Sequence, residues 1–69
     1  MFGIKVCFKE RGYWSKAYTY KSETAIDKGA VVVVPTGDFY SIGKVVESIE
    51  NYDFTGSINY KPIHSVVKV

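Results

Sequence analysis

The chain has 69 residues, 46% of them hydrophobic and 23% charged, with a net charge of +2. This length holds one domain, residues 1–69, with a small core, and the composition excludes a disordered chain. A single cysteine excludes an intramolecular disulfide and favours a reducing compartment. No apolar run is long enough to cross a membrane, so we expect a cytoplasmic protein without a membrane partner.

The first third of the chain predicts a β-hairpin. Residues 3–9 alternate apolar and polar side chains, which places Ile4, Val6 and Phe8 on one face of a half-buried strand. Residues 14–21 alternate again after a turn at Glu10-Arg11-Gly12. We therefore expect these two strands to pair with each other.

The middle of the chain predicts a second hairpin. Gly29 is expected to supply a positive φ that directs the chain into a β-branched run, residues 30–34, which has the composition of a strand covered on both faces. Pro35 should end this strand, because it cannot donate to the ladder. After a turn, residues 39–49 continue as a strand in which Gly43 is expected to mark a bend or bulge.

The last third predicts a loop and a broken strand. Residues 50–57 are polar except for Tyr52 and Phe54, and a final strand over residues 58–67 is split at Pro62. Five short strands and no amphipathic helix predict an all-β fold, a small five-stranded antiparallel barrel, because closure removes the exposed edges of a sheet.

Three stretches carry a resemblance to known proteins: YTYKS at 18–22, DKGAVVVVPTG at 27–37 and GKVVES at 43–48. The pattern resembles small phage-type proteins built as SH3-like β-barrels. More distantly, it is similar to the N-terminal DNA-end-binding domain of the replication-restart helicase, primosomal protein N′. The resemblance implies an SH3-like barrel, an association with replication or repair, and a location in the host cytoplasm if a phage encodes the protein. It transfers no binding residue to this chain.

The sequence contains no complete set of catalytic or metal-binding residues. The spacing from Gly37 to Gly43-Lys44 does not match a phosphate-binding P-loop, which also has to open a helix. Cys7 and His64 would approach each other if the first and last strands paired, but no third group is available to orient such a pair. One histidine and one cysteine cannot supply the ligands of a zinc site. We expect no enzymatic activity, no cofactor and no metal.

Aromatic side chains are the main candidates for recognition, because the chain has more of them than so small a barrel can enclose. Phe8, Tyr18, Tyr20 and Tyr60 are assigned to the core. The candidate binding residues are the aromatic side chains beside the turns and two neighbouring lysines, namely Tyr13, Trp14, Lys16, Phe39, Tyr40 and Lys44.

Three kinds of partner are compatible with these residues. A protein of nucleic-acid metabolism, bound and inhibited, is favoured over nucleic acid because an acidic excess lies in the segment that contains Phe39 and Tyr40. The alternative is single-stranded nucleic acid, held by the basic first hairpin while its bases stack on the aromatic rings. The third is another copy of the chain, paired through an open strand edge, so a monomer or a weak homodimer is expected.

Overall fold

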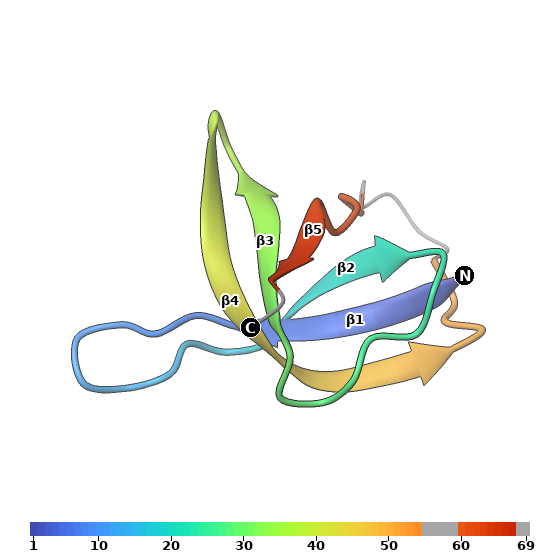
Figure 1. The fold of residues 1–69 in the computed structure, drawn as a ribbon, viewed down its shortest axis with the longest axis horizontal. Coiled ribbons are helices and arrows are strands. Elements are labelled where there is room, and N and C mark those ends of the chain that lie inside the picture. The colour runs from blue at the N-terminus through green and yellow to red at the C-terminus, as the bar shows by residue number, and fades with distance from the viewer. Residues whose placement is uncertain (55–59, 68–69) are drawn as a thin grey trace.

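The computed structural model describes residues 1–54 and 60–67, which form one antiparallel sheet of five strands and contain no helix. The strands are β1 (Phe2–Cys7), β2 (Tyr18–Ser22), β3 (Val31–Thr36), β4 (Phe39–Glu50) and β5 (Ser65–Val67). Their order across the sheet is β2-β1-β4-β3-β5 (Figure 1). The predicted all-β fold of five antiparallel strands is confirmed. Within the described ranges there is consequently no helix that could span a membrane.

Strand β4 joins the two halves of the sheet. Its first half pairs with β3, from Phe39 to Lys44, and its second half pairs with β1, from Lys44 to Glu50. The register with β1 shifts between Lys5 and Val6, so that Val46 is the extra residue of a β-bulge. Figure 1 shows the resulting bend, with β4 curving from the tip of one hairpin to the far end of β1.

The segment before β5 closes the sheet on its other side. The Lys21 N–H donates a hydrogen bond to the Lys61 carbonyl, and the Ile63 N–H donates one to the Lys21 carbonyl, both at 3.0 Å. Residues 61–63 therefore run beside β2 before the chain enters β5, which pairs with β3. These contacts cover part of the edges that an open sheet would expose and give the molecule a barrel-like shape.

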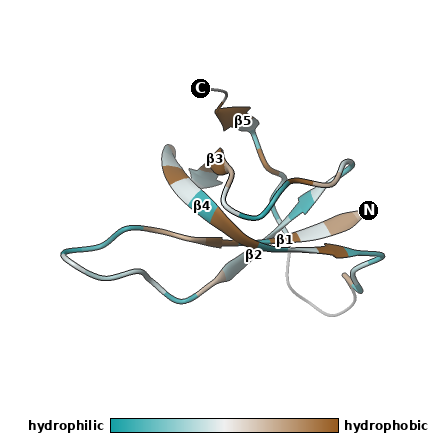
Figure 2. Ribbon diagram, turned by 60° about the horizontal axis from the view of Figure 1, so that its bottom comes forward, coloured by the Kyte–Doolittle hydropathy of each residue, from teal (hydrophilic) through white to brown (hydrophobic). Residues whose placement is uncertain are grey.

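The core lies between the two halves of the sheet. Figure 2 shows hydrophobic residues in the strands, whereas the loop between β1 and β2 is largely hydrophilic. Alternate residues of the strands point inward, as the sequence pattern predicts, and six of the seven core residues are aliphatic. The buried side chains are Ile4, Val6, Tyr20, Ile26, Val32, Val34 and Val45.

Three expectations about burial are wrong. Tyr60 is outside the core and only half-buried, packed on Tyr52 and Phe54. Tyr18 is 45% exposed, because it lies at the open end of β2, where its ring packs on Phe8 at 5.9 Å between ring centroids and remains outside the core. The valine run of β3 is not covered on both faces, since Val32 and Val34 are buried but Val31 and Val33 are only half-buried. The outer face of β3 is therefore partly open.

The structure also corrects the predicted ends and breaks of the strands. Pro35 lies inside β3 and pairs with Tyr40, next to the two-residue turn at Gly37 and Asp38. Strand β5 pairs only with residues 31–33 of β3. No strand lies beside Pro35 on that edge, so its lack of an N–H group costs no hydrogen bond there. Strand β2 begins at Tyr18 and not at Trp14. The bulge expected at Gly43 lies at Val46, three residues further along β4.

The predictions for the last third of the chain are met in part. Tyr52 and Phe54 do form the apolar contacts of their loop, since their rings lie 4.9 Å apart and both pack on Tyr60, which is not in a strand. Residues 58 and 59 of the expected final strand lie outside the described residues, and the strand that is described begins at Ser65.

Candidate functional site

One row of side chains follows the outer face of β4 and connects the candidate binding residues. Tyr40, Ile42, Lys44 and Val46 all point outward, whereas Gly43 and Val45 between them are buried. A strand rises about 3.3 Å per residue, so this row is about 20 Å long. We call these four residues the outer row of β4.

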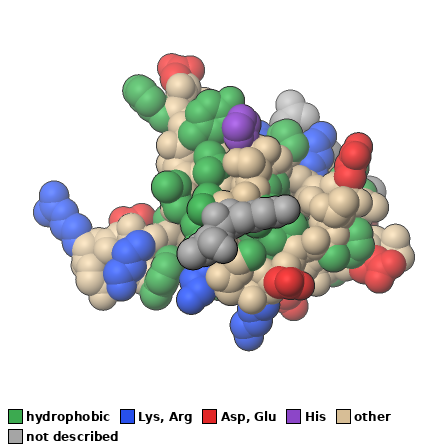
Figure 3. Space-filling view, viewed as in Figure 1, with side chains coloured by type: hydrophobic (Ala, Val, Ile, Leu, Met, Phe, Trp, Pro, Cys, Tyr) green, Lys and Arg blue, Asp and Glu red, His purple; other side chains and the backbone are tan. Residues whose placement is uncertain are grey.

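The first half of the outer row is apolar. Tyr40 is 62% exposed and Ile42 is 66% exposed, and their partners on β3 are Pro35 and Val33. Directly opposed residues of paired strands share a face. We call these four residues the apolar strip. Phe39, 77% exposed, lies beside it at the turn. Figure 3 shows hydrophobic side chains gathered over the β3–β4 hairpin.

The apolar strip has a defined shape. The two-residue turn of the β3–β4 hairpin has Gly37 at a φ of 61°, which suits the first central position of a tight hairpin turn. The Tyr40 ring packs edge-on against the ring of His64, with 4.7 Å between centroids. The His64 N–H in turn donates a hydrogen bond to the Val33 carbonyl at 2.9 Å. Tyr40 is thus held in place although most of its surface is open.

The second half of the outer row borders a cleft of about 620 Å³, which we call the Trp14 cleft. Trp14 forms one wall and is 48% exposed. The Nζ atoms of Lys9 and Lys44 lie 5.3 Å and 5.9 Å from the centroid of the Trp14 ring, within the range of a cation–π interaction. The residues that line the cleft are Cys7, Trp14, Lys28, Gly29, Lys44, Val45 and Val46.

Hydrogen bonds in the loop between β1 and β2 hold Trp14 over this cleft. The Ser15 N–H donates to the Phe8 carbonyl at 2.8 Å, and the Phe8 N–H donates to Ser15 Oγ at 2.9 Å. Lys9 and Trp14 form a further bridge, and the Glu10 N–H donates to the Tyr13 carbonyl at 2.7 Å. The loop is therefore a two-stranded ribbon that projects from the sheet (Figure 1).

The structure separates the residues that the sequence analysis grouped into one surface. Trp14 and Lys44 come together in the Trp14 cleft, with Tyr13 exposed on the same loop. Lys16 instead places its Nζ 5.4 Å from the ring centroid of Tyr18. Phe39 and Tyr40 lie at the other end of the outer row. Two surfaces joined by β4 thus replace a single surface around both turns.

Sequence reasoning missed several residues of these surfaces. Ile42 shares the outer row with Tyr40, and the alternation of side chains along a strand was the signal that would have found it. Lys9 pairs with Trp14 across the loop. The predicted hairpin with its turn at Glu10-Arg11-Gly12 would have found this pair, because the two residues flank that turn. Lys28 reaches the Trp14 cleft from the loop before β3, and no local pattern indicates that contact.

A second groove, of about 670 Å³, lies between the two hairpins. Its walls include Glu10, Tyr18, Tyr20 and Tyr40, and between them the hydroxyls of Thr36 and Ser41 lie 2.8 Å apart. Burial, and to a lesser degree the neighbouring Tyr18, raises the pKa of Tyr20 above its ordinary value. The raised pKa keeps the Tyr20 hydroxyl protonated to a higher pH than usual, and the charged side chains of Lys9 and Glu10 also line this groove.

The suggested pair of Cys7 and His64 does not form. Strand β1 pairs with β4 and β2, and both β4 and β3 lie between it and β5, so the expectation that the first and last strands might pair is wrong. Cys7 lines the Trp14 cleft, whereas His64 packs on Tyr40. Residues 1–54 and 60–67 contain no group of three or more side chains placed to hold a metal ion.

No protein-family model, curated protein or solved structure matches the chain. The function must therefore be inferred from the two surfaces along β4, within a small all-β, barrel-like fold.

Proposed function

We propose that this protein is a non-enzymatic binding module of the SH3-like barrel type, and that the apolar strip docks a protein partner. The observation that carries the proposal is the strip itself, in which Tyr40 and Ile42 are each more than half exposed beside Pro35 and Val33. Single exposed hydrophobic residues are ordinary, but contiguous ones mark interaction sites. The resemblance to phage-type barrels suggests a partner in nucleic-acid metabolism that the module inhibits.

The chemistry of the strip suits a protein partner better than a charged polymer. Tyrosine and phenylalanine are enriched at the centre of protein interfaces, where they contribute a large contact area for few rotatable bonds. Asp38 at the tip of the same hairpin would repel phosphate groups, whereas it could pair with a basic side chain of a protein. The hairpin is already ordered, so little conformational entropy is lost when it binds.

Site-specific photo-crosslinking in the source cell tests this proposal. A photoreactive amino acid replaces Ile42 in one variant and Lys61, an exposed residue beside β2, in a matched control. We expect one discrete adduct with another protein from position 42 and none from position 61. The additional substitution Tyr40→Ser should remove the adduct, because it deletes the neighbouring ring.

Two results would contradict a protein partner on the apolar strip. One is an adduct from position 42 with the mass of two copies of this chain, which would make the strip a homodimer contact. The other is an adduct that forms equally from position 61 or survives Tyr40→Ser.

A further inference from the structure

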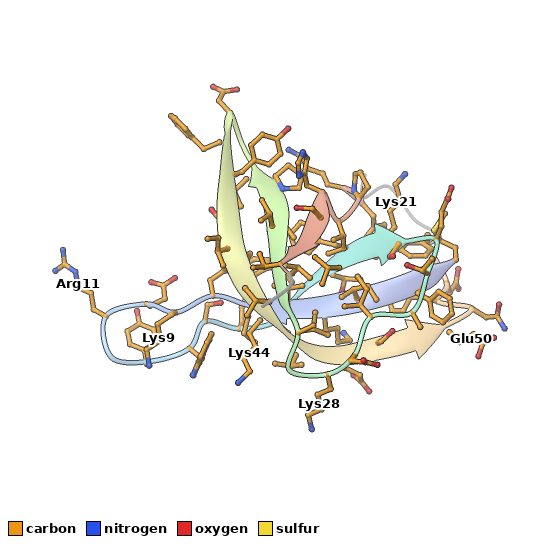
Figure 4. The ribbon with its side chains drawn as sticks, viewed as in Figure 1. Lys9, Arg11, Lys21, Lys28, Lys44 and Glu50 are labelled. Carbon is orange, nitrogen blue, oxygen red and sulfur yellow. The ribbon has the colours of Figure 1, made fainter. Side chains whose placement is uncertain are left out.

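The Trp14 cleft combines an apolar interior with a cationic rim. Its interior is made by the Trp14 ring together with the side chains of Val46 and Cys7 and the backbone of Gly29. Lys28 and Lys44 line the same cleft, and the Lys9 ammonium lies near the Trp14 ring from the other strand of the loop. In Figure 4 these three lysines lie along one side of the molecule, with Arg11 beyond them at the end of the loop.

Acidic groups do not cancel this charge. Glu10 and Lys9 both line the groove between the hairpins, but the Lys9 ammonium also lies 5.3 Å from the centroid of the Trp14 ring, on the wall of the Trp14 cleft. Glu47, which follows Val46, is directly opposed by Lys5 on β1. Asp27 precedes Lys28 in the loop and is the remaining carboxylate nearby in the chain. The three lysines at the cleft outnumber Asp27, so the rim is positive, and a positive rim favours an anionic ligand.

We infer that the Trp14 cleft binds single-stranded nucleic acid, with one base stacked on the Trp14 ring and the flanking phosphates on Lys9, Lys28 and Lys44. A nucleotide has both a flat apolar face and an anionic linkage, which match the interior and the rim. An acidic peptide without aromatic side chains would use the rim but not the ring. A duplex keeps its bases stacked on one another, so that none can reach Trp14.

This inference concerns a different surface from the apolar strip, and either can fail without the other. Position 42, which reports on the strip, does not line the cleft. The cleft also contains two built-in reporters, because Trp14 is the only tryptophan and Cys7 the only cysteine of the chain.

Fluorescence of Trp14, titrated with a short oligothymidylate at 50 and 200 mM salt, tests the inference. For single strands the logarithm of the affinity falls by about 0.7 per phosphate neutralised for each tenfold rise in salt. Three lysines therefore predict quenching with an affinity about 18-fold weaker at 200 mM salt than at 50 mM. In the variant Lys28→Gln/Lys44→Gln only about one phosphate contact remains, so the same rise in salt from 50 to 200 mM should weaken binding only about 2.6-fold.

Two further variants separate stacking from charge. Lys61→Gln removes an exposed lysine outside the cleft. In this variant the affinity should still fall about 18-fold between 50 and 200 mM salt, because about three phosphate contacts remain. Trp14→Ala, followed by anisotropy of a dye-labelled oligothymidylate, should weaken binding about tenfold through lost stacking while the salt dependence stays the same. Bound oligothymidylate should also slow the reaction of Cys7 with a disulfide reagent.

Three results would overturn the inference. The first is the absence of quenching and of Cys7 protection at 50 mM salt. The second is equal affinity for polyglutamate, which would make the cleft a site for any polyanion. The third is equal affinity for a duplex of the same length, which would show that no base reaches the Trp14 ring.

Discussion

Replacement of Gly43 by alanine tests how closely β4 packs on β1. Gly43 is buried in the middle of β4, and a Cβ atom there would overlap Cγ1 of Val6. It would also lie 3.0 Å from Cε1 of Phe8 and 3.1 Å from the Cys7 carbonyl oxygen. Val6 is fully buried and β-branched, so its side chain cannot rotate away from the new methyl group.

The expected effect is a net loss of stability. Overpacking of this kind costs about 1–3 kcal/mol. Alanine returns about 0.5–1 kcal/mol relative to glycine, because glycine loses more conformational freedom on folding. The midpoints of these two ranges give a net destabilisation of about 1.3 kcal/mol, which for a domain of this size lowers the Tm by about 5–10 °C.

Thermal unfolding, followed by far-UV circular dichroism, measures this effect in Gly43→Ala and in the double variant Val6→Ala/Gly43→Ala. The overlap with Cγ1 is absent when residue 6 is alanine, so Gly43→Ala should cost much less in the Val6→Ala background than in the unmodified chain. A Tm that is unchanged or raised by Gly43→Ala alone would refute the close packing of these strands.

Three other predictions concern single side chains. Because burial raises the pKa of Tyr20 above its usual 10.0, the folded state favours the protonated hydroxyl. The contribution of Tyr20 to stability should therefore be constant below pH 10 and be lost as pH rises through the raised pKa, and urea midpoints above pH 10 should decline less in Tyr20→Phe. Gly37→Ala places a side chain at a φ of 61° and should cost about 1 kcal/mol in urea unfolding, whereas Asp38→Ala beside it should cost little. Ser15→Ala removes the acceptor of the Phe8 N–H and should speed hydrogen exchange of that amide at least several-fold without changing exchange at Val32.

Local patterns predicted the strands because each strand has its own alternation. Residues 3–9 yielded β1 with Ile4 and Val6 inside, and the valine run yielded β3. The partners of each strand could not be predicted in the same way. The pairing of β1 with β4 joins residues about forty positions apart, and nothing within either segment specifies the other.

The candidate site was predictable to the extent that it depends on turns. Trp14, Phe39 and Tyr40 were expected to be exposed because they adjoin turns, and all three are. Their separation into two surfaces follows from the bend of β4, and the short β5 pairs with only residues 31–33 of β3. Both depend on how distant segments pack, which a single sequence does not encode locally.

The central claim is that the outer row of β4 is exposed to solvent while Gly43 and Val45, which lie between its residues, are buried. Single cysteines placed at Ile42 and at Val45, each in a Cys7→Ser background, measure this directly through their rates of reaction with a disulfide reagent. We predict that the cysteine at 42 reacts nearly as fast as a free thiol, and that the cysteine at 45 reacts only when the protein unfolds. Equal protection at both positions would contradict the account.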